Sequence, residues 1–198
     1  MRSPAPVFTT VSSTLALVAL VSCGCASSTS ARAVPSPSRA PLPAWHGALA
    51  QEFDDAIEAE ALEADQVRDH DAWVGPRTQA ADHVLRVVVV STTTQGVGHH
   101  QGYRLTLRVI GAPLSGSAPP SNTIELSIPP DSPVFPLARM HDIRLTGKTF
   151  LGFFKTFGAG DTQDLHWHLN AETAETLQAV ARASTLAEVG FQQAAPAR

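Results

Sequence analysis

Cysteine is nearly absent from this chain. Of its 198 residues only Cys23 and Cys25 are cysteine, and both lie near the N-terminus. The rest of the chain therefore offers no disulfide, no thiolate nucleophile and no cysteine-based metal site. Aromatic residues make up only 6% of the chain, and 14 Lys and Arg face 18 Asp and Glu. Without a strong positive field, nucleic-acid binding is not expected.

Long apolar runs are also missing. The densest run, Leu15–Val21, is much shorter than the roughly 20 residues that cross a bilayer. It suits the apolar region of a signal peptide instead, because Arg2 precedes it and small residues follow it. The run ends in the tetrapeptide Leu20-Val21-Ser22-Cys23.

This tetrapeptide resembles the lipobox of bacterial lipoproteins at all four positions. The resemblance implies that residues 1–22 are a lipoprotein signal peptide and that Cys23 becomes the first mature residue. Cys23 would then carry a diacylglyceryl group and, usually, a further acyl chain such as palmitate, which together anchor a protein firmly. Gly24 implies attachment to the outer membrane, facing the periplasm. Lipidation of Cys25 and ordinary secretory cleavage near Ala26 are the alternatives.

Composition divides the mature chain into several parts. Residues 23–46 are rich in Ser, Ala and Pro without an apolar period, which indicates a disordered tether. Residues 47–72 are acidic, and apolar residues at four-residue steps predict a helix from Ala48 to Val67. Its carboxylates could bind Ca²⁺, but the spacing of a calcium loop is missing, so a solvated helix face is preferred. Residues 82–190 are predicted to fold, and residues 191–198 to form a disordered tail.

Alternating hydrophobic residues predict a mainly β domain. Phe150–Phe157 has phenylalanines on both faces, which indicates a strand covered on both sides. Asn170 is suited to be the N-cap of a helix that runs to Ala183. The predicted strands are His83–Val90 as the central strand, Tyr103–Ile110, Ile124–Ile128, Ile143–Leu145, Phe150–Phe157 and Leu165–Leu169.

Strands at this spacing, with helices outside both ends, indicate a small antiparallel β-barrel or sandwich. Over Asp82–Leu169 their number and order resemble an OB-like barrel, including its netrin-type variant. The middle of the chain is also similar to uncharacterised proteobacterial lipoproteins. Neither resemblance implies a particular reaction.

The clearest candidate site is the strand sequence His166-Trp167-His168. Because alternate residues of a strand share a face, the two imidazoles are expected to be neighbours, and imidazole binds both Zn²⁺ and Cu²⁺. A metal site would need a third ligand. In the alternative interpretation Trp167 is buried and both histidines face solvent. The candidates for the third ligand are His99, His100, His141 and Asp164.

Motifs for other chemistry are missing. Thr146–Thr149 resembles the end of a P-loop, but Asp142 stands where the first glycine belongs and an aromatic strand follows, so nucleotide binding is not expected. No G-x-S-x-G motif occurs. We therefore predict a non-enzymatic binding or assembly module, held at the membrane through Cys23, with another envelope protein as partner. The alternatives are a periplasmic metal-binding protein using His166 and His168, and an enzyme without a recognisable motif.

Overall fold

The structure is a computed structural model that describes residues 41–58, 72–98, 101–159 and 162–194. The described residues, from 41 onwards, cluster as one compact unit. The predicted signal peptide, Cys23 and most of the tether lie outside the described residues.

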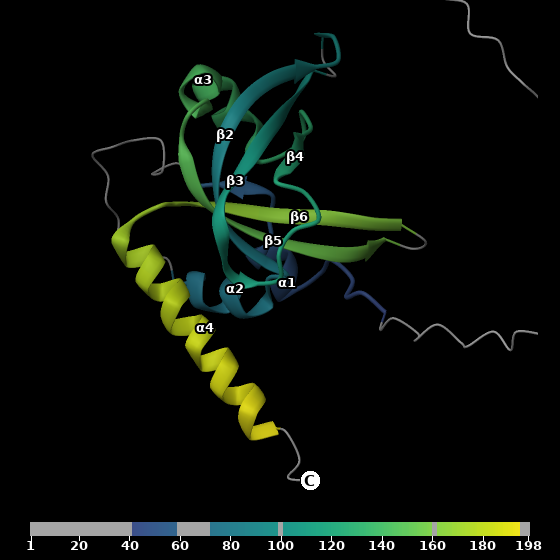
Figure 1. Ribbon diagram of the computed structural model, residues 1–198. Coiled ribbons are helices and arrows are strands. Elements are labelled where there is room, and N and C mark those ends of the chain that lie inside the picture. The colour runs from purple at the N-terminus through teal and green to yellow at the C-terminus, as the bar shows by residue number, and fades with distance from the viewer. Residues whose placement is uncertain (1–40, 59–71, 99–100, 160–161, 195–198) are drawn as a thin grey trace, which may run out of the picture. The chain divides into compact units, whose positions relative to one another are not determined.

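One six-stranded sheet forms the fold (Figure 1). The sheet order is β1-β6-β5-β2-β3-β4, and all neighbours are antiparallel except β1, which runs parallel to β6. The sheet curls into a half-barrel, so the predicted barrel-like β architecture is confirmed. The strands are β1 (Ala56–Ile57), β2 (His83–Gln95), β3 (Gly102–Gly116), β4 (Thr123–Ile128), β5 (Thr149–Ala159) and β6 (Thr162–Ala171).

The strand order explains where the barrel is open. If the five long strands β2 to β6 are numbered first to fifth by their order in the sequence, their order across the sheet is fifth, fourth, first, second, third. Helix α3 (Phe135–Leu145) lies between the third and fourth of them in the sequence. Such a sheet would close if its third and fifth long strands met, as in the five-stranded barrels that the sequence resembles. Here β4 and β6 are not paired, and the half-barrel stays open between them.

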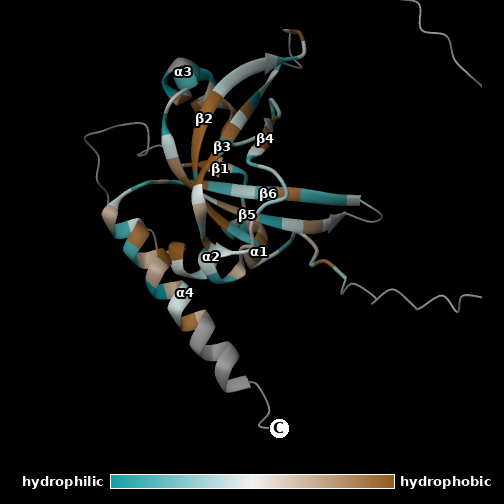
Figure 2. Cartoon of the chain, viewed as in Figure 1, coloured by the Kyte–Doolittle hydropathy of each residue, from teal (hydrophilic) through white to brown (hydrophobic). Residues whose placement is uncertain are grey.

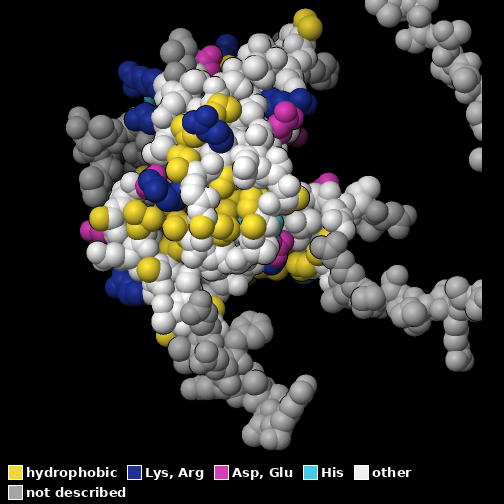
Figure 3. All heavy atoms as spheres, viewed as in Figure 1, with side chains coloured by type: hydrophobic (Ala, Val, Ile, Leu, Met, Phe, Trp, Pro, Cys, Tyr) yellow, Lys and Arg dark blue, Asp and Glu magenta, His cyan; other side chains and the backbone are white. Residues whose placement is uncertain are grey.

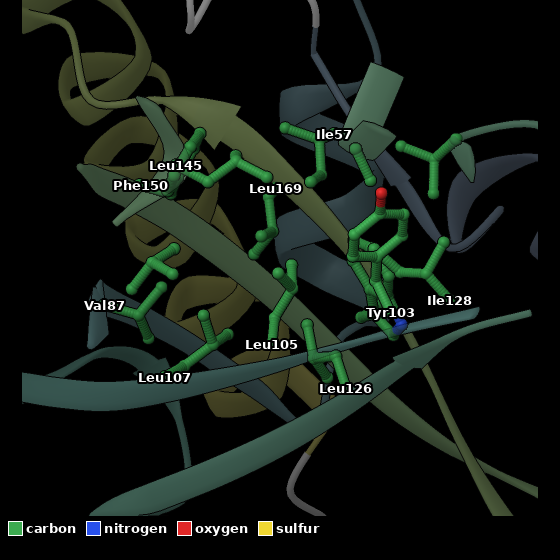
Figure 4. Close-up of a cluster of buried hydrophobic side chains, with 14 of the residues drawn as sticks. Ile57, Val87, Tyr103, Leu105, Leu107, Leu126, Ile128, Leu145, Phe150 and Leu169 are labelled. Atoms are coloured by element: carbon green, nitrogen blue, oxygen red, sulfur yellow. The ribbon is translucent and has the colours of Figure 1, made fainter. Parts of the chain in front are cut away.

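Two hydrophobic clusters pack on the two faces of the sheet. The inner cluster, inside the curl, is drawn in Figure 4, and α3 contributes Ala138 and Leu145 to it. The outer cluster lies against three helices, α1 (Ala48–Glu52), α2 (Val74–Ala80) and α4 (Ala174–Ala194). Alternation along β5 places Phe150 in the inner cluster and Phe153 in the outer one, so the prediction of a strand covered on both faces is confirmed.

Figure 2 shows hydrophobic residues along β2 and β3. The middle position of β2 in the sheet agrees with the prediction of a central strand there.

Two predicted elements are wrong in their described parts. The predicted helix 48–67 ends at Glu52, and the chain then turns at Asp55, whose φ is 54°, and pairs with β6 as β1. Long-range contacts override a helical period that is weak on its own. Ile143–Leu145 is the last turn of α3 rather than a strand, because three residues are too few to distinguish the two periods.

The boundaries of the tether and of the last helix also differ from prediction. Residues 41–46 are ordered against the domain, where the Gly158 N–H donates to the Pro43 carbonyl. Asn170 lies in β6, and Thr173 caps α4 instead, with its Oγ1 accepting from the Thr176 N–H at 3.1 Å. The helix continues to Ala194, into the tail that was predicted to be disordered.

Among the described helices, none combines the length and the apolar character needed to cross a membrane.

Candidate functional site

The segment that contains α1 and β1 crosses the β5–β6 hairpin, and we call these residues, 42–58, the strap. It begins beside the edge of β5 that faces β2, where the Pro43 carbonyl accepts from Gly158. It ends on the opposite edge of the hairpin, where β1 pairs with His168 and Leu169 of β6. Both predicted histidines lie under the strap.

Asp55 joins the strap to β6 through three hydrogen bonds. Its backbone N–H donates to the Trp167 carbonyl at 2.9 Å, and its Oδ1 accepts from the Trp167 N–H at 3.0 Å. Its Oδ2 lies 2.7 Å from His166 Nδ1. Because a carboxylate only accepts hydrogen bonds, the proton of this contact is assigned to Nδ1. The positive φ of Asp55, which Asp tolerates better than most residues, directs the carboxylate to both partners.

Asp54 and His168 repeat this pairing two residues further along β6. Asp54 Oδ1 lies 2.7 Å from His168 Nδ1, and the His168 side chain is only 7% exposed. Within the described residues, His168 Nε2 is buried and has no hydrogen-bond partner. The two imidazoles thus lie on one face of β6, as predicted, and each uses Nδ1 to hold the strap.

Aromatic contacts also fix the strap to the sheet. The Trp45 ring stacks on the His166 ring, with centroids 3.8 Å apart and planes 11° apart, and Trp45 Nε1 donates to the Phe53 carbonyl. The Phe53 side chain is fully buried in the outer cluster and meets Phe157 edge-on. The strap is therefore packed into the core as well as hydrogen-bonded to the sheet.

Polar contacts continue along β6 beyond the histidines. The Glu58 N–H donates to the Leu169 carbonyl, and the Glu58 carboxylate accepts from Asn170 Nδ2 and from the Ala171 N–H. Arg77 of α2 donates to the Glu52 carbonyl at 2.7 Å and to Asn170 Oδ1. These contacts join α2, the strap and β6.

Burial raises the pKa of the Asp55 carboxyl above its ordinary value of 3.8. The hydrogen bond and charge of His166 and the Trp167 N–H act in the opposite direction and only partly offset the burial.

The geometry corrects one of the two interpretations of the histidines. Trp167 is buried in the inner cluster, as the solvent-facing interpretation expects, but the histidines are covered by the strap rather than by solvent. The acids that pair with them, Asp54 and Asp55, were missed because the predicted helix placed them on a solvated face. The Nδ1–carboxylate arrangement orients histidines in metal sites and catalytic triads, leaving Nε2 to act.

None of the proposed third ligands joins the pair in the described structure. His141 is buried on α3, Asp164 is exposed on β6, and His99 and His100 lie outside the described residues. Across the parts of the chain that the structure describes, no three His, Cys, Asp or Glu side chains gather closely enough to hold a metal ion.

A second feature lies where the half-barrel is open. A cavity of about 250 Å³ has β4 on one side and Leu165 of β6 on the other, with Phe154 of β5 and His83 of β2 between them. Pro119 and Pro120 of the loop before β4 complete its wall. The cavity is thus mainly apolar, and its titratable lining groups are His83 and Glu125.

The surface charge is mixed. On the face drawn in Figure 3, hydrophobic side chains form a band across the middle of the molecule, and acidic and basic side chains are interspersed around it. Several cations are paired, as in the Arg86–Glu172 and Arg104–Glu125 ion pairs. The described residues on this face therefore carry charges of both signs side by side.

Comparison with protein-family models, with curated proteins and with solved structures gives no significant match to this chain.

Proposed function

We propose that this chain is a lipid-anchored protein of the cell envelope whose half-barrel is a non-enzymatic binding module. The observation that carries the binding role is the opening between β4 and β6, which leaves two strand edges and an apolar cavity accessible. Unpaired strand edges readily pair with another chain unless the protein covers them. The His166–Asp55 and His168–Asp54 contacts hold the strap against β6 and away from the opening.

The anchor is supported by the lipobox sequence at Leu20–Cys23. We expect the mature wild-type protein to begin at Cys23, to carry two or three acyl chains by intact mass, and to partition into detergent. A Cys25→Ala variant is the matched control and keeps all of these properties, whereas Cys23→Ala loses them. An unmodified N-terminus at any residue after Cys23 would show that the anchor is wrong.

The binding role is tested by affinity purification from detergent-solubilised membranes. We expect an envelope protein to copurify with the mature chain and to bind again when both proteins are purified. Binding that Cys23→Ala retains after purification would show that the half-barrel, rather than the lipid, makes the contact. If no copurifying protein rebinds, the binding role is rejected.

Metal binding by His166 and His168 is a second candidate, favoured by the Nδ1–carboxylate contacts of both rings and by His168 Nε2, which is buried without a hydrogen-bond partner within the described residues. The test compares Zn²⁺ and Cu²⁺ titrations of the wild type with His166→Asn/His168→Asn, whose amide nitrogens match the position of Nδ1 and can still donate to Asp54 and Asp55. Equal metal uptake by the two proteins would reject this candidate.

A further inference from the structure

The pairing of β4 with β3 determines which backbone N–H and C=O groups of β4 point towards its free edge. The Val109 N–H donates to the Asn122 carbonyl at 2.9 Å, so these two residues form a hydrogen-bonded pair between β3 and β4. In an antiparallel ladder such pairs alternate with pairs whose backbone groups point away. Thr123, Glu125 and Ser127 therefore direct their N–H and C=O groups to the open side. The Thr123 N–H is already bonded to Ser121 Oγ, which leaves Glu125 and Ser127 as the available donors.

The edge of β6 presents the complementary half of the opening. The carbonyls of Trp167 and Leu169 point away from β5, because they accept from Asp55 and Glu58 of the strap. The same alternation directs the backbone groups of Gln163 and Leu165 outwards. Within the described residues, β6 has no backbone partner on that side before Trp167. The strap thus shows that this edge pairs with an extended segment, and the unpaired part continues from it.

The cavity between these edges is large enough for a bulky side chain. Its volume of about 250 Å³ exceeds the roughly 150 Å³ of an apolar cavity that holds benzene. Leu165, which is 41% exposed, and Phe154 offer apolar contact inside it, while Glu125 lies on its β4 side. Neither Lys nor Arg lines it. Glu125 pairs with Arg104 of β3 at 3.3 Å, and its carboxylate has further acceptor sites for a second cation. A strand placed beside β4 would direct alternate side chains towards the cavity and towards solvent.

We propose that the opening binds an extended segment of another protein as an added strand along β4, with an apolar side chain in the cavity and a basic one near Glu125. This inference rests on the proposed binding role and names its partner chemistry. The chain's own tether is a poor occupant, since Pro35, Pro37, Pro41 and Pro43 lack the N–H groups that a ladder needs. The strap already lies on the β5–β6 hairpin.

The test uses a fluorescent heptapeptide with the sequence of residues 103–109 (Tyr-Arg-Leu-Thr-Leu-Arg-Val). In the protein this segment pairs with β4 on its other side, and its apolar residues alternate with Arg, Thr and Arg. Its binding to the full mature chain is followed by anisotropy. In Ser127→Pro one outward N–H is lost, and we expect binding about tenfold weaker, equivalent to one hydrogen bond. Ser127→Ala, the matched control, should bind within about twofold of wild type. An edge strand tolerates proline at such a position.

A second variant tests the cavity, and a third guards against misfolding. Leu165→Lys places a cation in the cavity and should also weaken binding of the basic peptide. Glu125→Pro removes the other outward donor and replaces Ser127→Pro if thermal unfolding shows that the latter is not folded. Its control is Glu125→Ala, which loses the same carboxylate but keeps the N–H. Equal binding by the proline and alanine variants, or no binding to wild type at up to about 1 mM peptide, overturns the proposal.

Two further results separate this inference from the proposed function. A membrane partner that copurifies and rebinds equally to wild type and Ser127→Pro would uphold the binding role and overturn the added strand. A dimer of the wild-type chain that Ser127→Pro abolishes would make a second copy the occupant and overturn the proposed partner.

Discussion

Phe53 tests whether the strap belongs to the folded unit. Its side chain is completely buried in the outer cluster, with its ring centroid 6.0 Å from that of Phe157. Truncating a core phenylalanine to alanine costs about 3–5 kcal/mol, the sum of lost burial and the cavity that remains. Domains are stable by only about 5–15 kcal/mol, so Phe53→Ala should remove a large part of the free energy of unfolding. For a chain of this size, the melting temperature should fall by about 6–20 °C.

Trp45→Ala is the matched control within the strap. It removes a larger ring, but Trp45 is 44% exposed and contributes one hydrogen bond and one stack. We expect a loss of about 1–2 kcal/mol. Urea unfolding of both variants, followed by far-ultraviolet circular dichroism, measures the difference. A cost below about 1 kcal/mol for Phe53→Ala, or a cost no larger than that of Trp45→Ala, would refute a structural role for the strap.

Three further predictions concern the backbone, the helix cap and the buried carboxyl. Gly116→Ala should be much more destabilising than Gly111→Ala in thermal unfolding: both glycines have φ above 70°, but only at Gly116 would a Cβ meet the Asp82 carbonyl oxygen, at 2.2 Å. Thr173→Ala should cost about 1 kcal/mol through loss of the α4 cap, and no change in urea unfolding would reject Thr173 as the cap. Because burial raises the Asp55 pKa, the folded chain holds that proton more tightly than the unfolded chain, so its stabilising effect is present in acid and is lost as pH rises from 3.8 through the raised value. Urea unfolding across this range should show wild type losing stability relative to Asp55→Asn as pH rises, and a difference that stays constant or grows would contradict burial as the cause.

The predictable part of the fold is the part with strong local signals. Clean alternation identified β3, β4 and β6, and the phenylalanines on both faces of β5 correctly indicated two packed layers. The order of these strands along the chain was enough to predict a barrel-like architecture. Local pattern failed at Ile143–Leu145, where three residues fit a strand and a helix equally well.

The site was only half predictable, for a physical reason. The i, i+2 spacing of His166 and His168 placed them on one face of β6, but their partners are more than 110 residues away in the sequence. Asp54 and Asp55 lie in an acidic stretch with a helical period, and nothing local distinguishes these two carboxylates from their neighbours. Their role depends on a turn at Asp55 that is stabilised by Trp167, a tertiary contact. The one sequence signal for this pairing is that two adjacent acids, Asp54 and Asp55, correspond in number to the two histidines on one face of β6.

The strap and the opening together determine how a tethered half-barrel would meet a partner. The strap covers the edge of β6 at Trp167 and Leu169, and its Phe53 and Ile57 are buried in the two clusters. An added strand therefore cannot extend along β6 past His166 without displacing core residues, at a cost of several kcal/mol. The edge of β4 has no such cover in the described structure. Binding should consequently depend on Glu125 and Ser127 more than on any group of β6. A partner whose binding was lost on mutation of the strap but not of β4 would contradict this reasoning.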